Sequence, residues 1–431
     1  MLALLKRQMK TKPLRVALLG FGTVGGSVTR ILCERPELSD RLQLTHIFNR
    51  DVARKRAAWV PSSVTWTEDA DVLFGAKPDV VVEVVGGVDP AGGWVRRALQ
   101  QGAAVVTANK MLLAAHGPEL LNLAVTHETQ LRFEAAVAGG VPLIHGVREG
   151  LSGDRLMRVA GILNGTSNYV LSTMAAGDQS MTDVLVDARR LGYAEADPSA
   201  DIDGDDAGAK LVVLAGIAFR RHLLLKDIPK SSIRPISAAD FRYASRLGCT
   251  IRQIAMVETR GDGFDARVGP ALVPSGSNFG LNMGANNVIA ISGHYGGDNS
   301  FSGAGAGGPA TAVAVVSDLL SLTGRNHDQG EQWLPAKIAP PPPRPYYLRF
   351  VIRDRPGIVA TIAESLARRS INLEAMLQEP GYPKDRLPFV ITVEACEEAA
   401  LGAALEEIGR ADFHAEPPLA LPMLLGDSQR P

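Results

Sequence analysis

The sequence predicts an α/β protein in three parts: a doubly wound parallel sheet, an α+β domain, and a small ferredoxin-like module of order βαββα(β). Three observations lead to this prediction. A short apolar strand runs into Gly20-x-Gly22-x-x-Gly25, and a helical pattern follows. Strand and helix patterns then alternate to about residue 135. Much later, a proline run over residues 340–345 separates a tail with a pattern of its own.

The alternating first part predicts the parallel sheet. Its apolar, largely β-branched runs are expected to be strands, at residues 14–19, 42–48, 80–85, 103–107 and 130–135. Helices are expected between them, at residues 27–32, 94–101 and 118–128. Parallel strands joined by helices form a doubly wound sheet, so we place the first domain at residues 1–140.

The pattern changes near Val141, and a substrate-binding and dimerisation domain is expected at residues 141–304. Its strands include residues 157–161 and 251–258, and its helices include residues 181–191 and 205–219. A glycine cluster and a helical run follow. We expect the helix within residues 305–325 to pack back on the first domain.

The proline-rich segment 331–345 is expected to be a stiff linker of polyproline type. Beyond it, residues 346–431 are expected to form the small module. Its predicted elements follow in order: a strand at 346–353, a turn at 354–357, a helix at 358–369, strands at 371–377 and 388–395, and a helix at 397–408.

Composition excludes several classes of protein. The net charge of −1 gives no general attraction to nucleic acid or to acidic membranes. No run approaches the roughly 18 apolar residues of a membrane span, and the basic first residues lack the apolar core of a signal peptide. The three cysteines, Cys33, Cys249 and Cys396, lie far apart, which indicates a reducing compartment. We therefore expect a cytoplasmic protein without nucleic-acid or membrane partners.

The glycine turn predicts a dinucleotide site of the Rossmann type. Gly20 allows the tight turn, Gly22 allows the backbone to approach a pyrophosphate, and Gly25 allows the helix to pack closely on the strand. The N–H groups at the helix N-terminus would bind the phosphates. The expected contacts are Phe21, Gly22, Thr23, Val24 and Gly25.

The end of the second strand bears on the choice of cofactor. Arg50 stands where an arginine would accommodate the 2′-phosphate of NADP, whereas Asp51 could bind the ribose hydroxyls of NAD. The sequence slightly favours NADP over NAD. The neighbouring Arg54 and Lys55 are equally well explained as a solvated charge cluster.

Two further motifs follow strands. Thr107-Ala-Asn-Lys110 ends a parallel strand, at the edge where ligands of open sheets bind, although Lys110 could be an ordinary surface lysine. Asn164-Gly165-Thr166 opens a helix and by itself indicates a capped turn.

The segment 192–210 is rich in carboxylates and leads into a helix. Asp206 and Lys210 share one face of that helix, which could mean an exposed ion pair of modest value. However, residues 207–219 are almost wholly apolar or small, as in a buried helix. Burial lowers the pKa of a lysine towards values useful for proton transfer, so a functional lysine is the favoured interpretation.

Several long motifs, in order, resemble those of the homoserine dehydrogenase family across about residues 14–330. They are Gly20-Phe-Gly-Thr-Val-Gly25, Glu83-Val-Val-Gly-Gly87, Thr107-Ala-Asn-Lys110, Phe133-Glu-Ala-Ala-Val-Ala-Gly-Gly-Val-Pro142, Gly161-Ile-Leu-Asn-Gly-Thr-Ser-Asn-Tyr169, the segment 192–210, and Gly305-Ala-Gly-Gly-Pro-Ala-Thr311. The tail resembles an ACT domain, on the weaker basis of Asp354-Arg-Pro-Gly357 and Ile371-Asn372.

The resemblance implies the reversible, NAD(P)-linked conversion of L-homoserine to L-aspartate 4-semialdehyde, on the route to threonine and methionine. It implies a homodimer or homotetramer, and inhibition by threonine through the tail. Such modules usually pair edge to edge and hold an amino acid at the shared interface, here near the turn 354–357 and Asn372.

The resemblance also implies residue roles. Lys210 resembles the catalytic lysine, Asp206 its acidic partner, and Lys110 a second lysine near the nicotinamide. Substrate contacts are implied for Tyr193, Glu195, Asp201, Asn164, Gly165 and Thr166. Cofactor contacts are implied for Gly86, Thr107, Gly305 and Gly307, in addition to Lys110. A structural Na⁺ or K⁺ site, mostly of backbone carbonyls, is implied at Glu134, Val137, Gly139 and Val141.

One departure and two rival functions stay open. Ala200 stands where family members often carry an acid, so the acid that replaces it is undetermined. A semialdehyde dehydrogenase would need a nucleophilic cysteine, and none of the three lies beside these motifs. A non-catalytic amino-acid or nucleotide sensor would not need Lys210, Asp206 and Lys110.

Overall fold

The computed structural model describes residues 12–177, 179–323 and 332–424. It divides into two compact units. Unit 1 comprises the described residues within 1–156, 212–225 and 303–336, and unit 2 comprises the other described residues. The division falls inside helix α10 (Asp205–Phe219), after Leu211. No helix among the described residues is long and apolar enough to cross a membrane.

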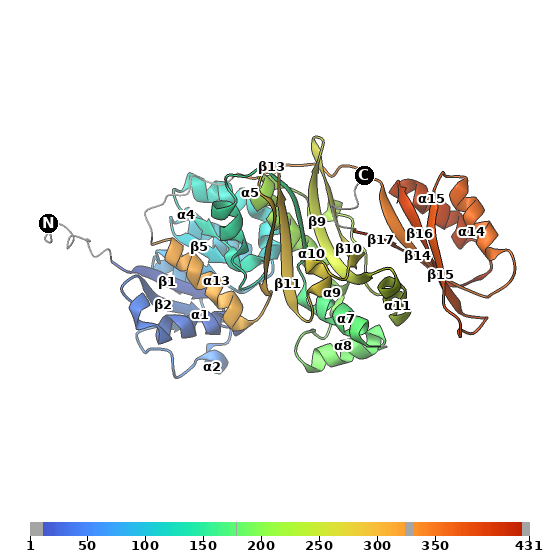
Figure 1. Cartoon of the computed structure of the whole chain (residues 1–431). Helices are drawn as coiled ribbons and strands as arrows, with labels where there is room; N and C mark the ends of the chain where they lie inside the picture. Colours follow the sequence, from blue (N-terminus) through green and yellow to red (C-terminus); the bar gives the residue numbers. More distant parts are fainter. Residues whose placement is uncertain (1–11, 178, 324–331, 425–431) are drawn as a thin grey trace, which may run out of the picture. The chain divides into compact units, whose positions relative to one another are not determined.

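A six-stranded sheet forms the centre of unit 1, with the order β3-β2-β1-β4-β5-β6 (Figure 1). All its neighbouring strands pair in parallel, and the order is that of a doubly wound Rossmann sheet. Val81, Val105 and Leu18 are at most 1% exposed because helices cover both faces. The strands are β1 (Leu14–Leu19), β2 (Leu42–Phe48), β3 (Thr65–Thr67), β4 (Val80–Glu83), β5 (Ala104–Thr107) and β6 (Leu131–Arg132).

The late helix of the chain packs on the first helix of unit 1, and Figure 1 shows the two side by side. They are α13 (Gly308–Ser321) and α1 (Thr23–Glu34). The other helical elements of unit 1 are η1 (Pro36–Leu38), α2 (Val52–Lys55), α3 (Ala70–Gly75), α4 (Ala91–Gln100), α5 (Lys110–Thr126), η2 (Glu134–Ala136), α6 (Leu143–His145) and η3 (Gly146–Gly150). A two-stranded sheet joins β8 (Arg221–His222) to β13 (Leu334–Pro335).

Unit 2 contains a five-stranded sheet with the order β10-β9-β7-β11-β12. Its strands are β7 (Leu156–Ile162), β9 (Cys249–Arg260), β10 (Gly263–Pro274), β11 (Asn286–Gly293) and β12 (Gly297–Ala304). Strand β9 pairs antiparallel with both β7 and β10. The accompanying helices are α7 (Gly165–Ala176), α8 (Met181–Arg190), α9 (Ser199–Ile202), α11 (Ala238–Arg246) and α12 (Asn278–Leu281), and η4 (Leu225–Asp227) lies at the division.

The tail forms a four-stranded antiparallel sheet, β15-β16-β14-β17, within unit 2. Its elements are β14 (Arg344–Ile352), α14 (Ile358–Ala367), β15 (Leu373–Gln378), β16 (Leu387–Cys396), α15 (Glu398–Gly409) and β17 (His414–Pro422). Strand β17 completes the predicted βαββα(β) order, so the ferredoxin-like prediction is confirmed.

The sheet of the tail separates two features that the sequence placed together. Asn372 accepts a hydrogen bond from the Glu394 backbone, beside the N-terminal end of β14. The turn 354–357 follows the C-terminal end of β14, where the Asp354 backbone donates to Lys384. About seven extended residues lie between these ends, which corresponds to about 20 Å.

Some predicted element limits are wrong. The strand expected at 130–135 covers only β6, because Glu134–Ala136 turns into a 3₁₀ helix. Helix α5 begins at Lys110 and continues through Pro118, so the proline does not start the helix. The limits expected for the three domains and the linker stay predictions, since the compact units of the structure are drawn differently.

Candidate active site

A polar cluster in unit 2 brings together residues from two segments that are distant in sequence, 163–164 and 201–210. Lys210 Nζ, on α10, donates to Asp206 Oδ2 at 2.7 Å and to the Leu163 carbonyl at 2.7 Å. Asn164 Nδ2 donates to the same Asp206 oxygen at 2.9 Å and to Asp201 Oδ1 at 2.6 Å. One amide therefore links the two carboxylates, and the ammonium binds one of them directly.

The surroundings of this cluster are largely dry. The side chains of Lys210 and Asp206 are only 11% and 13% exposed, so this pair is not the exposed surface pair of the alternative interpretation. Burial raises the pKa of the Asp201 carboxyl, and the Asp206 charge raises it further against the opposing hydrogen bond from Asn164. A buried lysine between carboxylates can hold or release a proton while the carboxylates attract a substrate ammonium.

Local structure fixes Asn164 in place. It is the N-cap of α7, where its Oδ1 accepts from the Ser167 backbone at 2.8 Å. Ser167 then donates to Gln253 Oε1 at 2.8 Å, and Gln253 donates to the Asp201 carbonyl at 3.0 Å. The capped turn predicted from the sequence therefore also orients the cluster, because the cap uses the amide oxygen and leaves the amide nitrogen for the carboxylates.

The carboxylates of the acidic segment have different surroundings. Asp203 pairs with Arg234 at 3.0 Å, and Asp205 pairs with Lys230. Among the acids of residues 195–206 that the structure describes, hydrogen bonds join Asp201 and Asp206 to the lysine cluster. Glu195 is exposed in its loop and is not joined to this cluster by any hydrogen bond of the described chain.

The loop around Tyr193 closes over the start of α7. Thr166 Oγ1 donates to the Tyr193 carbonyl at 2.6 Å, and the Tyr193 and Tyr169 rings lie 4.7 Å apart. Tyr193 itself is 46% exposed. Gly165 allows a close approach, since a Cβ there would lie 2.7 Å from the Ala285 carbonyl oxygen.

The predicted dinucleotide turn in unit 1 has the geometry that its glycines require. A Cβ on Gly25 would lie 2.1 Å from the Gly20 carbonyl oxygen, so α1 packs directly on the turn. A Cβ on Gly22 would meet nothing within 4 Å, which leaves open space over the N-terminus of α1. Phe21 is buried and its ring lies 4.7 Å from the ring of Trp66. The open space fits a bound pyrophosphate.

The ends of β4 and β5 are joined by a buried carboxylate that sequence reasoning did not single out. Glu83 is fully buried and accepts from the backbone of Val85 at 2.8 Å and of Gly86 at 3.0 Å. Thr107 Oγ1 also donates to Glu83, at 2.6 Å. The acid in an otherwise apolar strand was the available signal. Lys110 is half-buried at the first position of α5.

The positions of Arg50 and Asp51 at the end of β2 are now defined. Asp51 is the N-cap of α2, and its Oδ1 accepts from the Arg54 backbone at 3.0 Å. Arg50 is exposed directly after the strand. One carboxylate oxygen of Asp51 is therefore occupied by the cap, whereas the Arg50 guanidinium lies in solvent.

The segment expected to hold a monovalent cation lies in unit 1 between η2 and α6. Val137 and Val141 are buried, and Ala138 and Gly139 adopt left-handed conformations with φ of 58° and 56°. A Cβ on Gly139 would lie 2.7 Å from Gly305, so this loop packs directly on the late glycine segment. Gly307 is also left-handed, with φ of 113°.

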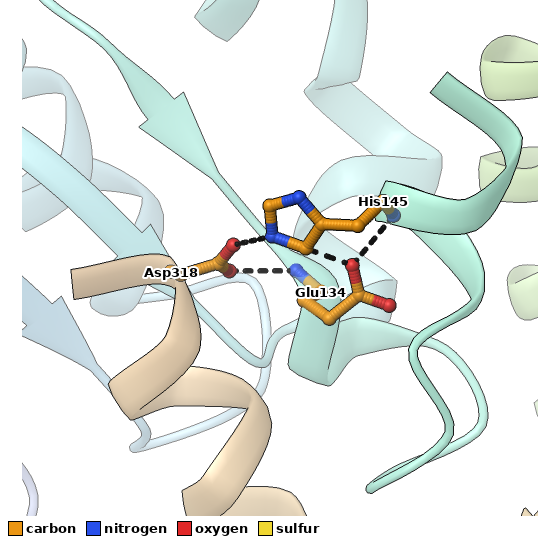
Figure 2. Close-up of side chains that lie close together, drawn as sticks. All are labelled: Glu134, His145 and Asp318. Carbon is orange, nitrogen blue, oxygen red and sulfur yellow. Dashed lines mark hydrogen bonds and ion pairs between the residues drawn. The ribbon is translucent and has the colours of Figure 1, made fainter. Parts of the chain in front are cut away.

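Both ends of this loop meet α13 at a buried charged cluster. His145 Nε2 lies 3.0 Å from Asp318 Oδ1 and 3.6 Å from Glu134 Oε2 (Figure 2). The hydrogen bond and charge of Asp318 raise the pKa of His145 to about 9, and burial raises the pKa of Glu134.

A Rossmann sheet with an open phosphate turn, and a buried lysine–carboxylate cluster suited to an amino-acid substrate, define a dinucleotide-dependent oxidoreductase. Three family models match the chain: the homoserine dehydrogenase NAD-binding domain at residues 20–134, homoserine dehydrogenase at 142–320, and the ACT domain at 346–413. The chain belongs to the homoserine dehydrogenase family.

Individual relatives extend this match over most of the chain. Homoserine dehydrogenase of Mycobacterium tuberculosis is 37% identical, over 93% of this chain and 95% of the relative. A crystal structure of a homoserine dehydrogenase from Thiobacillus denitrificans is 34% identical with a TM-score of 0.88, and covers 96% and 98% of the two chains. A hyperthermophilic archaeal homoserine dehydrogenase in complex with NADPH is 26% identical with a TM-score of 0.63, and covers 73% and 99%.

Proposed function

We propose that the lysine–carboxylate cluster of unit 2 is the substrate site at which homoserine and aspartate 4-semialdehyde are interconverted. The hydrogen-bonded group Lys210–Asp206–Asn164–Asp201 carries this proposal. Two hydrogen bonds of the Lys210 ammonium are taken up by Asp206 and Leu163, which leaves its third position for a substrate oxygen. A bound nicotinamide supplies the hydride acceptor or donor.

In this proposal each residue has one task. When homoserine is oxidised, the neutral amine form of Lys210 would accept the hydroxyl proton and become the ammonium, while the carbon that bears the hydroxyl gives its hydride to the nicotinamide. In the reverse direction Lys210 returns the proton to the aldehyde oxygen. Asp206 and Asp201 bind the α-ammonium, so Asp201 takes the place of the acid that is missing at Ala200. Tyr193, Glu195, Gly165 and Thr166 would line the remainder of the site.

The test is homoserine oxidation by the full chain, followed at the nicotinamide absorbance band. We expect Asp206→Asn to raise the KM for homoserine and to lower kcat, because the variant loses a charge opposite both ammonium groups. Asp203→Asn is the matched control, since Asp203 pairs with Arg234 instead. Equal effects of the two variants would contradict the assignment.

We propose that Gly22, Thr23, Val24, Gly86, Thr107, Lys110, Gly305 and Gly307 contact the dinucleotide, with NADP preferred. The exposed Arg50 and the use of Asp51 as a helix cap support this preference. The test is Arg50→Ala, with Arg54→Ala in the following helix α2 as the control. We expect only Arg50→Ala to raise the KM for NADP relative to that for NAD. No change would make Asp51 the better candidate, as a ribose ligand for NAD.

We propose in addition that Glu134, Val137, Gly139 and Val141 hold Na⁺ or K⁺, mostly through backbone carbonyls. The apolar, buried side chains of this loop leave the backbone as its main source of oxygen ligands. The expected result is a thermal midpoint that rises with added NaCl or KCl and not with tetramethylammonium chloride at equal ionic strength. Equal effects of the three salts would contradict it.

We propose threonine as the effector of the ACT domain, in a homodimer or homotetramer. Initial rates with and without threonine test this on the full chain. The Asn372→Ala variant should lose the inhibition by threonine. It should keep the uninhibited rate, because Asn372 lies in the tail, where its amide donates to Glu394. Inhibition that survives this change unaltered would move the effector site away from Asn372.

A further inference from the structure

Three side chains from three elements of unit 1 meet in a buried cluster: Glu134 from η2, His145 from α6 and Asp318 from α13. Figure 2 shows the His145 ring facing both carboxylates. The two carboxylate side chains are only 2% exposed, whereas that of His145 is 24% exposed. Two carboxylates so close in a dry place repel each other unless a cation or a shared donor lies between them.

The hydrogen bonds of the cluster connect backbone as well as side chains. Glu134 accepts from the backbone of Ile144 and of His145, both at 2.8 Å. Asp318 Oδ2 accepts from the Glu134 backbone at 2.8 Å, while its Oδ1 faces His145. The cluster therefore closes the loop 134–145 on itself and fixes it to α13.

Helix α13 leads from this cluster to the predicted dinucleotide turn. Its first residue, Gly308, packs so closely on α1 that a Cβ there would lie 2.8 Å from Thr23 and 2.7 Å from Ser27 Oγ. The closed loop supports the same end of the helix, since the Gly140 backbone donates to the Ala304 carbonyl at 3.3 Å. A displacement of α13 would thus change the packing against Thr23, within the glycine turn.

We propose that His145 is a positioning residue for the dinucleotide. It holds Glu134 and Asp318 together, and it thereby fixes α13 and the glycine segment 305–308 against the turn 20–25. This inference rests on the proposed cofactor contacts at those two segments. Because the cluster, α13 and the turn all belong to unit 1, the effect falls on cofactor affinity and not on homoserine affinity.

The test compares His145→Gln with His145→Lys in the full chain. Glutamine keeps a donor but has no charge, whereas lysine restores a cation between the carboxylates. Dinucleotide affinity is measured directly by NADPH fluorescence, and the KM for homoserine is measured at saturating cofactor. His116→Gln is the matched control, because His116 forms a half-exposed pair with Glu119 at 3.2 Å in the same unit.

We expect His145→Gln to raise the Kd for NADPH about tenfold, with the KM for homoserine unchanged, and His145→Lys to restore most of the affinity. His116→Gln should behave as the wild type. Asp318→Asn should raise the Kd similarly, and the double variant with His145→Gln should be no worse than either single change.

Several results would overturn the proposal. An unchanged Kd in His145→Gln, additive effects in the double variant, or equal losses of cofactor and homoserine affinity would each do so. If EDTA abolishes dinucleotide affinity in the wild type and His145→Lys fails to restore it, the cluster is a divalent-metal site instead. A wild-type chain that binds no NADPH would refute the proposed cofactor contacts themselves.

Discussion

Asp206 holds the lysine–carboxylate cluster together, because one of its oxygens accepts from both Lys210 and Asn164. The arrangement depends on helical spacing and on a cap. Asp206 and Lys210 are one turn apart on α10, and Asn164 begins α7. Because water is largely excluded from this group of charges, each interaction within it is stronger, and each of its members is difficult to replace.

The first prediction concerns Lys210→Met. It should lower kcat by about 10²–10⁴-fold, because the variant has no amine to exchange a proton at the substrate oxygen. NADPH affinity, measured by fluorescence, should stay close to that of the wild type. Lys230→Met is the control. It removes the ion pair of Lys230 with Asp205, which lies in the first turn of the same helix as Lys210, and it should leave kcat unchanged. A Lys210→Met enzyme of normal kcat would remove this lysine from the mechanism.

The second prediction concerns how the stability of the protein at different pH depends on Asp201. Its pKa is raised, chiefly by burial, so the folded state holds this proton more tightly than the unfolded state does. The contribution of this proton to the free energy of unfolding is fully present at a pH below the ordinary pKa of an aspartate. It is lost as the pH rises through the raised pKa of the folded state. Asp201→Asn should therefore raise the thermal midpoint at neutral pH and have little effect in acid, while homoserine affinity falls. A larger gain in acid than at neutral pH would contradict this sign.

At the scale of elements, the sequence predicts the strands with strong apolar patterns and misses others, among them both edge strands of the five-stranded sheet of unit 2. Strands β1 and β2 were predicted to the residue. Strand β10 was missed because Gly269-Pro270 interrupts it, yet it lies at an edge, where proline is tolerated. Strand β12, at the other edge, has no buried residue and hence no apolar signal.

The candidate site follows the same logic. Spacing along one helix revealed Asp206 and Lys210, because both lie in a single element. The choice of Asp201 over its acidic neighbours needed tertiary structure, since only the folded chain brings Asn164 to it. Glu83 was likewise hidden, because its partners Gly86 and Thr107 become neighbours only when β4 and β5 pair.

The glycine turn makes a paired prediction. Gly25→Ala should lower the free energy of unfolding by about 1–3 kcal/mol, because its Cβ would collide with the Gly20 carbonyl. Gly22→Ala should unfold like the wild type, since nothing lies within 4 Å of its Cβ, but it should bind NADPH more weakly. Thermal unfolding and NADPH fluorescence measure the two effects. Loss of stability in Gly22→Ala alone would reverse the roles of these glycines.

At the scale of the whole molecule, the tail is built into unit 2 and is not a separate appendage. Arg349 on β14 pairs with the fully buried Asp240 on α11, and Tyr347 donates to the same carboxylate at 2.9 Å. Arg344 pairs with Asp265 on β10 at 2.5 Å. Removal of the tail would take Arg349 and Tyr347 away from Asp240 and Arg344 away from Asp265, so point variants test its role better than truncation does.

Arg349→Leu should lower the free energy of unfolding by about 3–5 kcal/mol, because it leaves the Asp240 carboxylate buried without a cation. Arg355→Leu, at the exposed pair with Asp412, is the control and should change stability little. Chemical denaturation of the full chain measures both. Similar losses in the two variants would show that burial of the Arg349–Asp240 pair is unimportant.

The separation of Asn372 from the turn 354–357 has a consequence for how the enzyme would sense its effector. The two features lie at opposite ends of β14, so one molecule of threonine cannot contact both within a single chain. A site that uses both must be shared by two copies. Its occupancy then depends on enzyme concentration as well as on threonine. Threonine inhibition should fade on dilution as the copies dissociate, and a chemical crosslink between copies should preserve it.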